Sequence, residues 1–177
     1  GVLVNNVIFP WIVSGTTLTK FQFFGTYITN GTLNVAGILI APTIGYCLAR
    51  NKNYNNKITA AIMALATLII MMPINITATT VKNSHMVNVT GALSFQNIGT
   101  TGMFSGIIIG LLATEMFIKL SKIKKLQIHL SDSVPSAVAG SFNTMIPALI
   151  TMSLFAILAS VLTVVFHTDL ISLITSL

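Results

Sequence analysis

Charged residues and cysteine are both scarce in this sequence. The first scarcity argues against an ordinary soluble domain, and the second excludes a disulfide within the chain. Only 7% of the 177 residues are charged, and three of these are acids, whereas about 25% is usual for soluble domains. Cys47 is the single cysteine, so no disulfide can form within the chain, and its place inside an apolar run indicates simple packing. No nucleophile elbow, phosphate-binding glycine loop or dinucleotide fingerprint is present. The sequence therefore offers no motif of a familiar enzyme class.

The main feature of the sequence is instead a set of four long apolar stretches, at residues 33–49, 58–76, 102–118 and 145–166. Hydrophobic residues make up 54% of the chain, and the mean hydropathy is +0.89. A helix rises about 1.5 Å per residue, so stretches of this length can cross a hydrocarbon core of about 30 Å with modest tilt or thinning. The sequence predicts an all-α protein, a polytopic transmembrane helical bundle of four spans, with residues 1–177 in a single membrane domain.

The basic residues are distributed unevenly between the two ends of these predicted spans. The cations after the first and third spans are Arg50, Lys52, Lys57, Lys119, Lys122, Lys124 and Lys125. The opposite end has only Lys20 and Lys82. Because Lys and Arg near span ends resist translocation, we expect the larger group to lie in the cytosol. The net charge of +6 is thereby assigned to membrane anchoring, and nucleic acid is not expected as a partner.

The segments around the spans suggest smaller features. Residues 1–32 are rich in aromatics, so we expect an interfacial segment at headgroup depth, with packing onto neighbouring helices as the open alternative. Residues 77–101 are polar and β-branched, which is compatible with a small hairpin. Asp132 precedes a short amphipathic stretch, which we expect to form a cytosolic helix capped by that residue. The chain begins at Gly1 without a signal peptide, and we interpret it as a fragment of a longer protein.

Small residues recur at every fourth position in two of the predicted spans. One such stripe contains Gly102, Gly106 and Gly110, and the other contains Gly37, Ala41 and Gly45. A spacing of four places each set on one helix face and lets another backbone approach closely. These six residues are the candidates for helix packing or a dimer interface. Packing within one subunit is the preferred interpretation, and contact between subunits stays open.

Few side chains are candidates for chemistry. Glu115 is the only acid within a predicted span, where a carboxylate is by default a candidate for a substrate or proton pathway. Lys119 follows four residues later, at the spacing of a helical ion pair, so we favour a paired carboxylate. His85, His129 and His167 lie in separate segments without metal-ligand spacing. We therefore assign no catalytic, substrate-binding or metal-binding residue and expect no cofactor.

Several stretches resemble a known family of membrane proteins. Residues 91–117 contain the runs GALSF, IG, GMF and ATEMF, and residues 44–49 read IGYCLA. Residues 130–142, LSDSVPSAVAGSF, are similar to a family motif that reads MPDGVPPAVARSF. Together these stretches resemble the membrane IIC components of the bacterial phosphotransferase system (PTS), lactose/cellobiose type. The replacements in the motif, Gly140 for arginine among them, mark a divergent member.

That resemblance implies a function. Such proteins are homodimeric, multi-pass sugar permeases of the bacterial cell membrane, which move a disaccharide inward while the cytosolic IIB and IIA components phosphorylate it. It also implies that this chain is the scaffold or dimerisation half, and that the sugar site lies in the missing half. His85, His129, His167 and Glu115 do not align with the family's site residues. The alternative is a small membrane channel or a structural membrane subunit, although no ring of charge or filter loop is present.

The predicted orientation is testable by chemical labelling. With Cys47 replaced by serine, a cysteine introduced by Lys122→Cys should react with a membrane-impermeant maleimide only after the cells are made permeable, because the basic loops resist translocation. Labelling of that cysteine in intact cells would overturn the orientation.

Overall fold

The computed structural model of the chain describes residues 1–13, 15–73, 75–79, 86–127 and 136–175. It is largely helical, and three helical stretches are long and apolar enough to cross a membrane: Thr17–Asn51, Thr100–Ser121 and Phe142–Val165. A shorter apolar helix covers Lys57–Ile70. The predicted helical membrane fold is confirmed, whereas the count of four spans and the extent of the membrane domain stay predictions.

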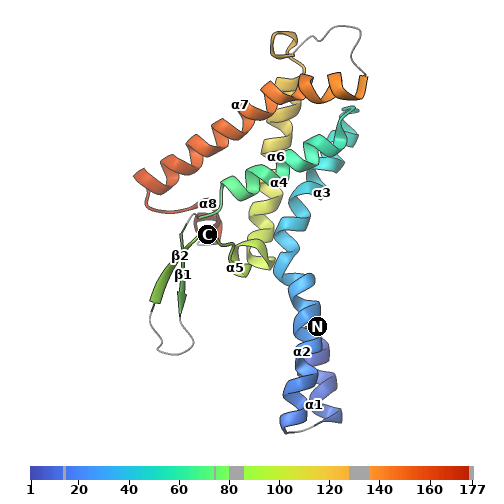
Figure 1. The fold of residues 1–177 in the computed structure, drawn as a ribbon, viewed down its shortest axis with the longest axis vertical. Helices are drawn as coiled ribbons and strands as arrows, with labels where there is room; N and C mark the ends of the chain where they lie inside the picture. Colours follow the sequence, from blue (N-terminus) through green and yellow to red (C-terminus); the bar gives the residue numbers. More distant parts are fainter. Residues whose placement is uncertain (14, 74, 80–85, 128–135, 176–177) are drawn as a thin grey trace.

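Three helices form the centre of the molecule. The helices α3 (Ala36–Asn51), α4 (Lys57–Ile70) and α6 (Thr100–Ser121) pack on one another, and α7 (Ser136–Val165) crosses α4 and α6 obliquely (Figure 1). The buried apolar residues form two clusters along this bundle. One contains Ala41, Leu68, Met71, Ile109 and Ala113, and the other contains Ala49, Ala60, Met63, Phe117 and Ile118.

The N-terminal segment is a helical hairpin that extends beyond the bundle (Figure 1). A π-helical turn η1 (Val4–Ile8) and α1 (Phe9–Ile12) fold back along α2 (Thr16–Gly31). Asn5 joins the two arms: its Nδ2 donates to the Gln22 carbonyl oxygen at 2.9 Å, and Gln22 Nε2 donates to the Asn5 carbonyl oxygen at 3.3 Å.

A 3₁₀ turn, η2 (Leu33–Val35), connects α2 to α3. The apolar helical stretch therefore begins at Thr17, well before the predicted start at residue 33. The placement of residues 1–32 at the membrane interface stays a prediction.

The second predicted span, 58–76, is wrong at its C-terminal end. Helix α4 stops at Ile70, because Pro73 has no amide hydrogen to donate and disfavours helical geometry just before it. The chain then forms strand β1 (Asn75–Thr79), which pairs antiparallel with β2 (Met86–Thr90). The predicted hairpin is therefore present and begins slightly earlier than expected.

The segment from β2 to α6 turns sharply and forms a short helix. Gly91 follows β2 with φ +71°, a conformation that favours glycine. The short helix α5 (Phe95–Ile98) is capped by Ser94, whose Oγ accepts a hydrogen bond from the Gln96 amide at 3.2 Å.

The last two predicted spans differ in accuracy. Helix α6 extends the prediction for 102–118 by only a few residues. Helix α7 begins at Ser136, nine residues before the predicted start of the fourth span at 145. The described part of the expected amphipathic helix is therefore the first turns of α7 and not a separate helix, whereas Asp132 lies outside the described residues. A short helix, α8 (Leu170–Thr175), follows α7.

Candidate functional site

The two stripes of small residues lie against each other at the α3–α6 contact. An added β-carbon at Gly106 would lie 2.8 Å from the Gly37 carbonyl oxygen, and one at Gly110 would lie 3.0 Å from that of Ala41. On the other helix, a β-carbon at Gly37 would lie 3.0 Å from the carbonyl carbon of Gly102. The two backbones are thus in direct contact, and glycine is required where each carbonyl group faces the neighbouring helix.

Gly45 extends this contact to a third helix. A β-carbon there would lie 2.9 Å from Ala64 Cβ, 2.9 Å from Thr114 Oγ1 and 3.0 Å from the Ala60 carbonyl oxygen. One position on α3 therefore meets both α4 and α6. All of the small residues in the two stripes are buried. These contacts favour packing within one subunit, and a role for the stripes in a dimer interface stays a prediction.

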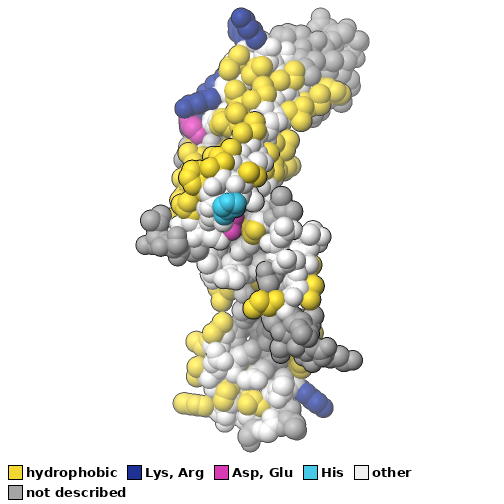
Figure 2. Space-filling view, turned by 90° about the vertical axis from the view of Figure 1, so that its left-hand side faces the viewer, with side chains coloured by type: hydrophobic (Ala, Val, Ile, Leu, Met, Phe, Trp, Pro, Cys, Tyr) yellow, Lys and Arg dark blue, Asp and Glu magenta, His cyan; other side chains and the backbone are white. Residues whose placement is uncertain are grey.

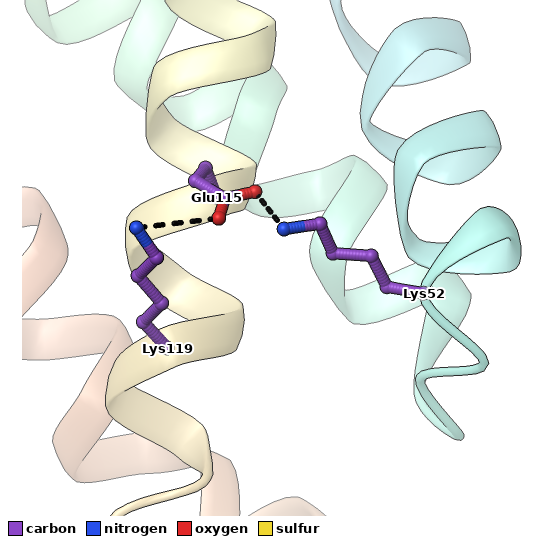
Figure 3. Close-up of polar contacts among 3 residues, drawn as sticks. All are labelled: Lys52, Glu115 and Lys119. Carbon is purple, nitrogen blue, oxygen red and sulfur yellow. Dashed lines mark hydrogen bonds and ion pairs between the residues drawn. The ribbon is translucent and has the colours of Figure 1, made fainter.

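Glu115 joins α6 to the end of α3 (Figure 3). Its Oε2 forms an ion pair with Nζ of Lys52, which directly follows α3, and its Oε1 lies 3.4 Å from Lys119 Nζ. The favoured pairing with Lys119 is confirmed, while the pairing with Lys52 was not predicted. No short-range pattern signals that contact, because the two residues are 63 positions apart in sequence.

The ion pair places the two predicted basic loops at one end of the bundle. The loop after α3 and the end of α6 lie close together there, and Tyr54 of that loop packs edge-on against Phe117 of α6, with ring centroids 5.8 Å apart. Burial raises the pKa of the Tyr54 phenol, and its hydrogen bond with Ser121 opposes this. Figure 2 shows Lys and Arg side chains toward the upper end and another near the lower end, with hydrophobic side chains over the face between them. Which end is cytosolic stays a prediction.

The remaining titratable residues do not form a catalytic constellation in the described part of the chain. No group of three His, Cys, Asp or Glu side chains that could hold a metal occurs there. His85 and His129 lie outside the described residues, and His167 lines a cavity of about 380 Å³ together with Asp169.

Asp169 caps α8, a role that was not predicted from the sequence. It accepts hydrogen bonds from the Ser172 amide at 2.9 Å and from the Ser172 hydroxyl at 2.6 Å. An acid three residues before a serine, at the start of a short apolar run, is a capping pattern that could have revealed this role.

Comparison with known proteins identifies the family. The model of the family described as "Phosphotransferase system, EIIC" matches residues 3–177. The chain belongs to this family. The resemblance seen in the sequence is therefore confirmed, and so is the prediction of a bacterial membrane protein with several apolar helices.

Relatives of this EIIC chain differ in the sugar that their names give. The oligo-beta-mannoside-specific EIIC component of Bacillus subtilis (strain 168) is 29% identical over 169 residues, which cover 96% of this chain and 37% of the relative. The galactose-specific EIIC component of Lactococcus lactis subsp. cremoris (strain MG1363) is 31% identical over 158 residues, which cover 84% of this chain and 34% of the relative. The chain thus spans about a third of the length of these relatives.

A solved structure has the same fold as this EIIC chain. The crystal structure of the transporter ChbC, the IIC component from the N,N'-diacetylchitobiose-specific phosphotransferase system, matches with a TM-score of 0.75. The match covers 84% of this chain and 34% of that one, at 22% sequence identity. At this identity the match shows the helical arrangement alone and does not extend to the sugar specificity.

Replacing Gly106 with leucine should force α3 away from α6, because even one added carbon would lie 2.8 Å from the Gly37 carbonyl oxygen. We expect a loss of about 1–3 kcal/mol of stability in detergent, measured by thermal unfolding with circular dichroism. The matched control is Gly31→Leu at the end of α2, where an added β-carbon meets nothing within 4 Å. Equal stability of the two variants would contradict the close packing of α3 on α6.

Removing the two lysines of the Glu115 cluster should have unequal effects. Lys52→Gln breaks a link between two helices, whereas Lys119→Gln breaks a contact within α6 whose lysine side chain is 72% exposed. We expect Lys52→Gln to lower the Tm in low-salt detergent and Lys119→Gln to leave it nearly unchanged, with the difference shrinking at high salt. The same loss from both substitutions would show that Glu115 does not couple α3 to α6.

Proposed function

We propose that this chain is the scaffold half of an EIIC sugar permease. The whole permease moves a disaccharide of the cellobiose or lactose kind inward, and the cytosolic IIB and IIA components supply the phosphoryl group that the sugar receives. The family match over residues 3–177 and the sugar-specific names of the relatives support this assignment.

The observation that carries the scaffold role is the closed interior of α3, α4 and α6. Their facing positions are filled by small and apolar residues, and backbone atoms of α3 and α6 are in direct contact. A disaccharide needs a cavity lined by several polar groups. The α3–α6 contact has no room for one, so the sugar site is expected in the part of the permease outside this chain.

A rigid bundle is suited to alternating access. In transporters of this general design, one bundle moves against another that keeps its shape. Close-packed interiors do not deform continuously, so the α3–α4–α6 bundle would act as the fixed body. The ion pair between Lys52 and Glu115 adds a further link between α3 and α6 at the basic end.

The permease is also proposed to be a homodimer, and the stripe contacts bear on where its subunits meet. Because the small-residue faces of α3 and α6 are buried within one chain, we propose that the dimer uses other surfaces and that the stripes serve packing within the subunit. Helix α7 exposes large apolar side chains along its length, including Leu149, Ile157 and Val164. That face is available to a second copy or to the remainder of the permease.

The alternative of a small channel or structural subunit is not favoured. The relatives are sugar permease components. The glycine stripes that would line a conduit are closed by the direct contact of α3 with α6.

The scaffold proposal predicts a dimer that does not bind sugar. In detergent, the 177-residue chain should sediment as a dimer in analytical ultracentrifugation and give no heat of binding with cellobiose or lactose by calorimetry, because the sugar site lies elsewhere. The full-length Bacillus subtilis relative, titrated with an oligo-β-mannoside, is the positive control. Submillimolar sugar binding by the chain would refute the scaffold role, and a monomer at all concentrations would refute the dimer.

A further inference from the structure

A small cavity lies at the basic end of the bundle, between the end of α3 and the start of α4. Its volume is about 250 Å³, and it is lined by Tyr46, Asn55, Asn56, Lys57, Ile58 and Thr59. None of these lining residues belongs to the two buried apolar clusters of the bundle. It is also separate from the Glu115 ion pair, which lies between α6 and Lys52.

One wall of the cavity is apolar and exposed. Tyr46 is 41% exposed and Ile58 is 71% exposed, and Ile62, one turn further along α4, is 58% exposed. In a membrane-spanning bundle such side chains face lipid tails. The ring of Tyr46 lies near the end of α3, as expected for a tyrosine at headgroup depth. The apolar wall therefore continues from the cavity along α4 toward the middle of the bilayer.

The other wall is polar and positively charged. Lys57 and the Asn55 amide line it, and Arg50 lies four residues after Tyr46, on the same face of α3. Among the described residues, Glu115 pairs with Lys52 and Lys119, and no acid pairs with Arg50 or Lys57. This wall therefore presents positive charge that is not neutralised by a described side chain.

We propose that this cavity binds an anionic phospholipid. Lys57 would hold the phosphate, and Arg50, one turn beyond Tyr46 on α3, would add positive charge beside it. Asn55 would bind polar groups of the head, and an acyl chain would lie along Ile58 and Ile62. Basic pockets between helices at the headgroup level recognise such lipids. A soluble phosphate would satisfy the cations and leave the apolar wall uncovered, whereas a phospholipid matches both walls.

Native mass spectrometry of the chain purified in neutral detergent tests the site. With equal amounts of dioleoyl phosphatidylglycerol and dioleoyl phosphatidylcholine, we expect phosphatidylglycerol to be retained in preference. Lys57→Gln should reduce its retention by about fivefold, the effect expected of one cation near an anionic lipid. Asn55→Asp, which adds an anion and hardly changes size, should reduce it at least as much.

Two control variants, each lacking one cation outside the cavity, distinguish lipid binding at this cavity from general attraction to a positive surface. Lys122→Gln removes a cation from the same end, outside the cavity, and Lys20→Gln removes one from the N-terminal hairpin. Both should retain phosphatidylglycerol within twofold of the unaltered chain. Equal loss in Lys57→Gln and Lys122→Gln, equal retention of phosphatidylcholine, or displacement of the lipid by millimolar inorganic phosphate would each overturn the proposal.

Discussion

The close approach of α3 and α6 is the constraint on which the rest of this structure depends. Lipid tails are as apolar as leucine, so helices in a bilayer gain little from burying apolar surface and are held by packing and polar contacts. The carbonyl groups of Gly37 and Ala41 lie where side chains at Gly106 and Gly110 would otherwise be. Once these backbones touch, Gly45 can receive α4, and Lys52 comes within reach of Glu115. The arrangement of the central helices thus follows from a few positions at which glycine leaves room for a neighbouring backbone.

The features that could be predicted from sequence are those set by local periodicity. The span at 102–118 and the Glu115–Lys119 pair depend on neighbours along one helix, and both were found close to their predicted form. Errors occurred where other effects dominate. Pro73 and the pairing of β1 with β2 end α4 early, although the apolar run continues beyond it. The contact between Lys52 and Glu115 depends on how two helices align, which hydropathy does not encode.

The distribution of charge gives this bundle two chemically different ends. At the basic end, Glu115 is the acid that forms ion pairs among the described residues, and its partners are Lys52 and Lys119. The other cations at that end therefore interact with the surroundings. In a membrane, those surroundings are water and phospholipid headgroups. The basic residues predicted to fix orientation during insertion therefore include those proposed above to bind an anionic lipid. The predicted orientation and the proposed lipid preference thus both depend on the uneven distribution of basic residues between the two ends of the bundle.

The early end of α4 affects the membrane itself. Its 14 residues rise about 21 Å, which is some 9 Å less than a typical hydrocarbon core. The helix is also inclined to α3 and α6, which shortens its reach further (Figure 1). Hydrophobic mismatch of this kind is relieved when acyl chains compress or when protein replaces them. A bilayer crossed by α4 would therefore be locally thin, unless another part of the permease shielded that flank from lipid.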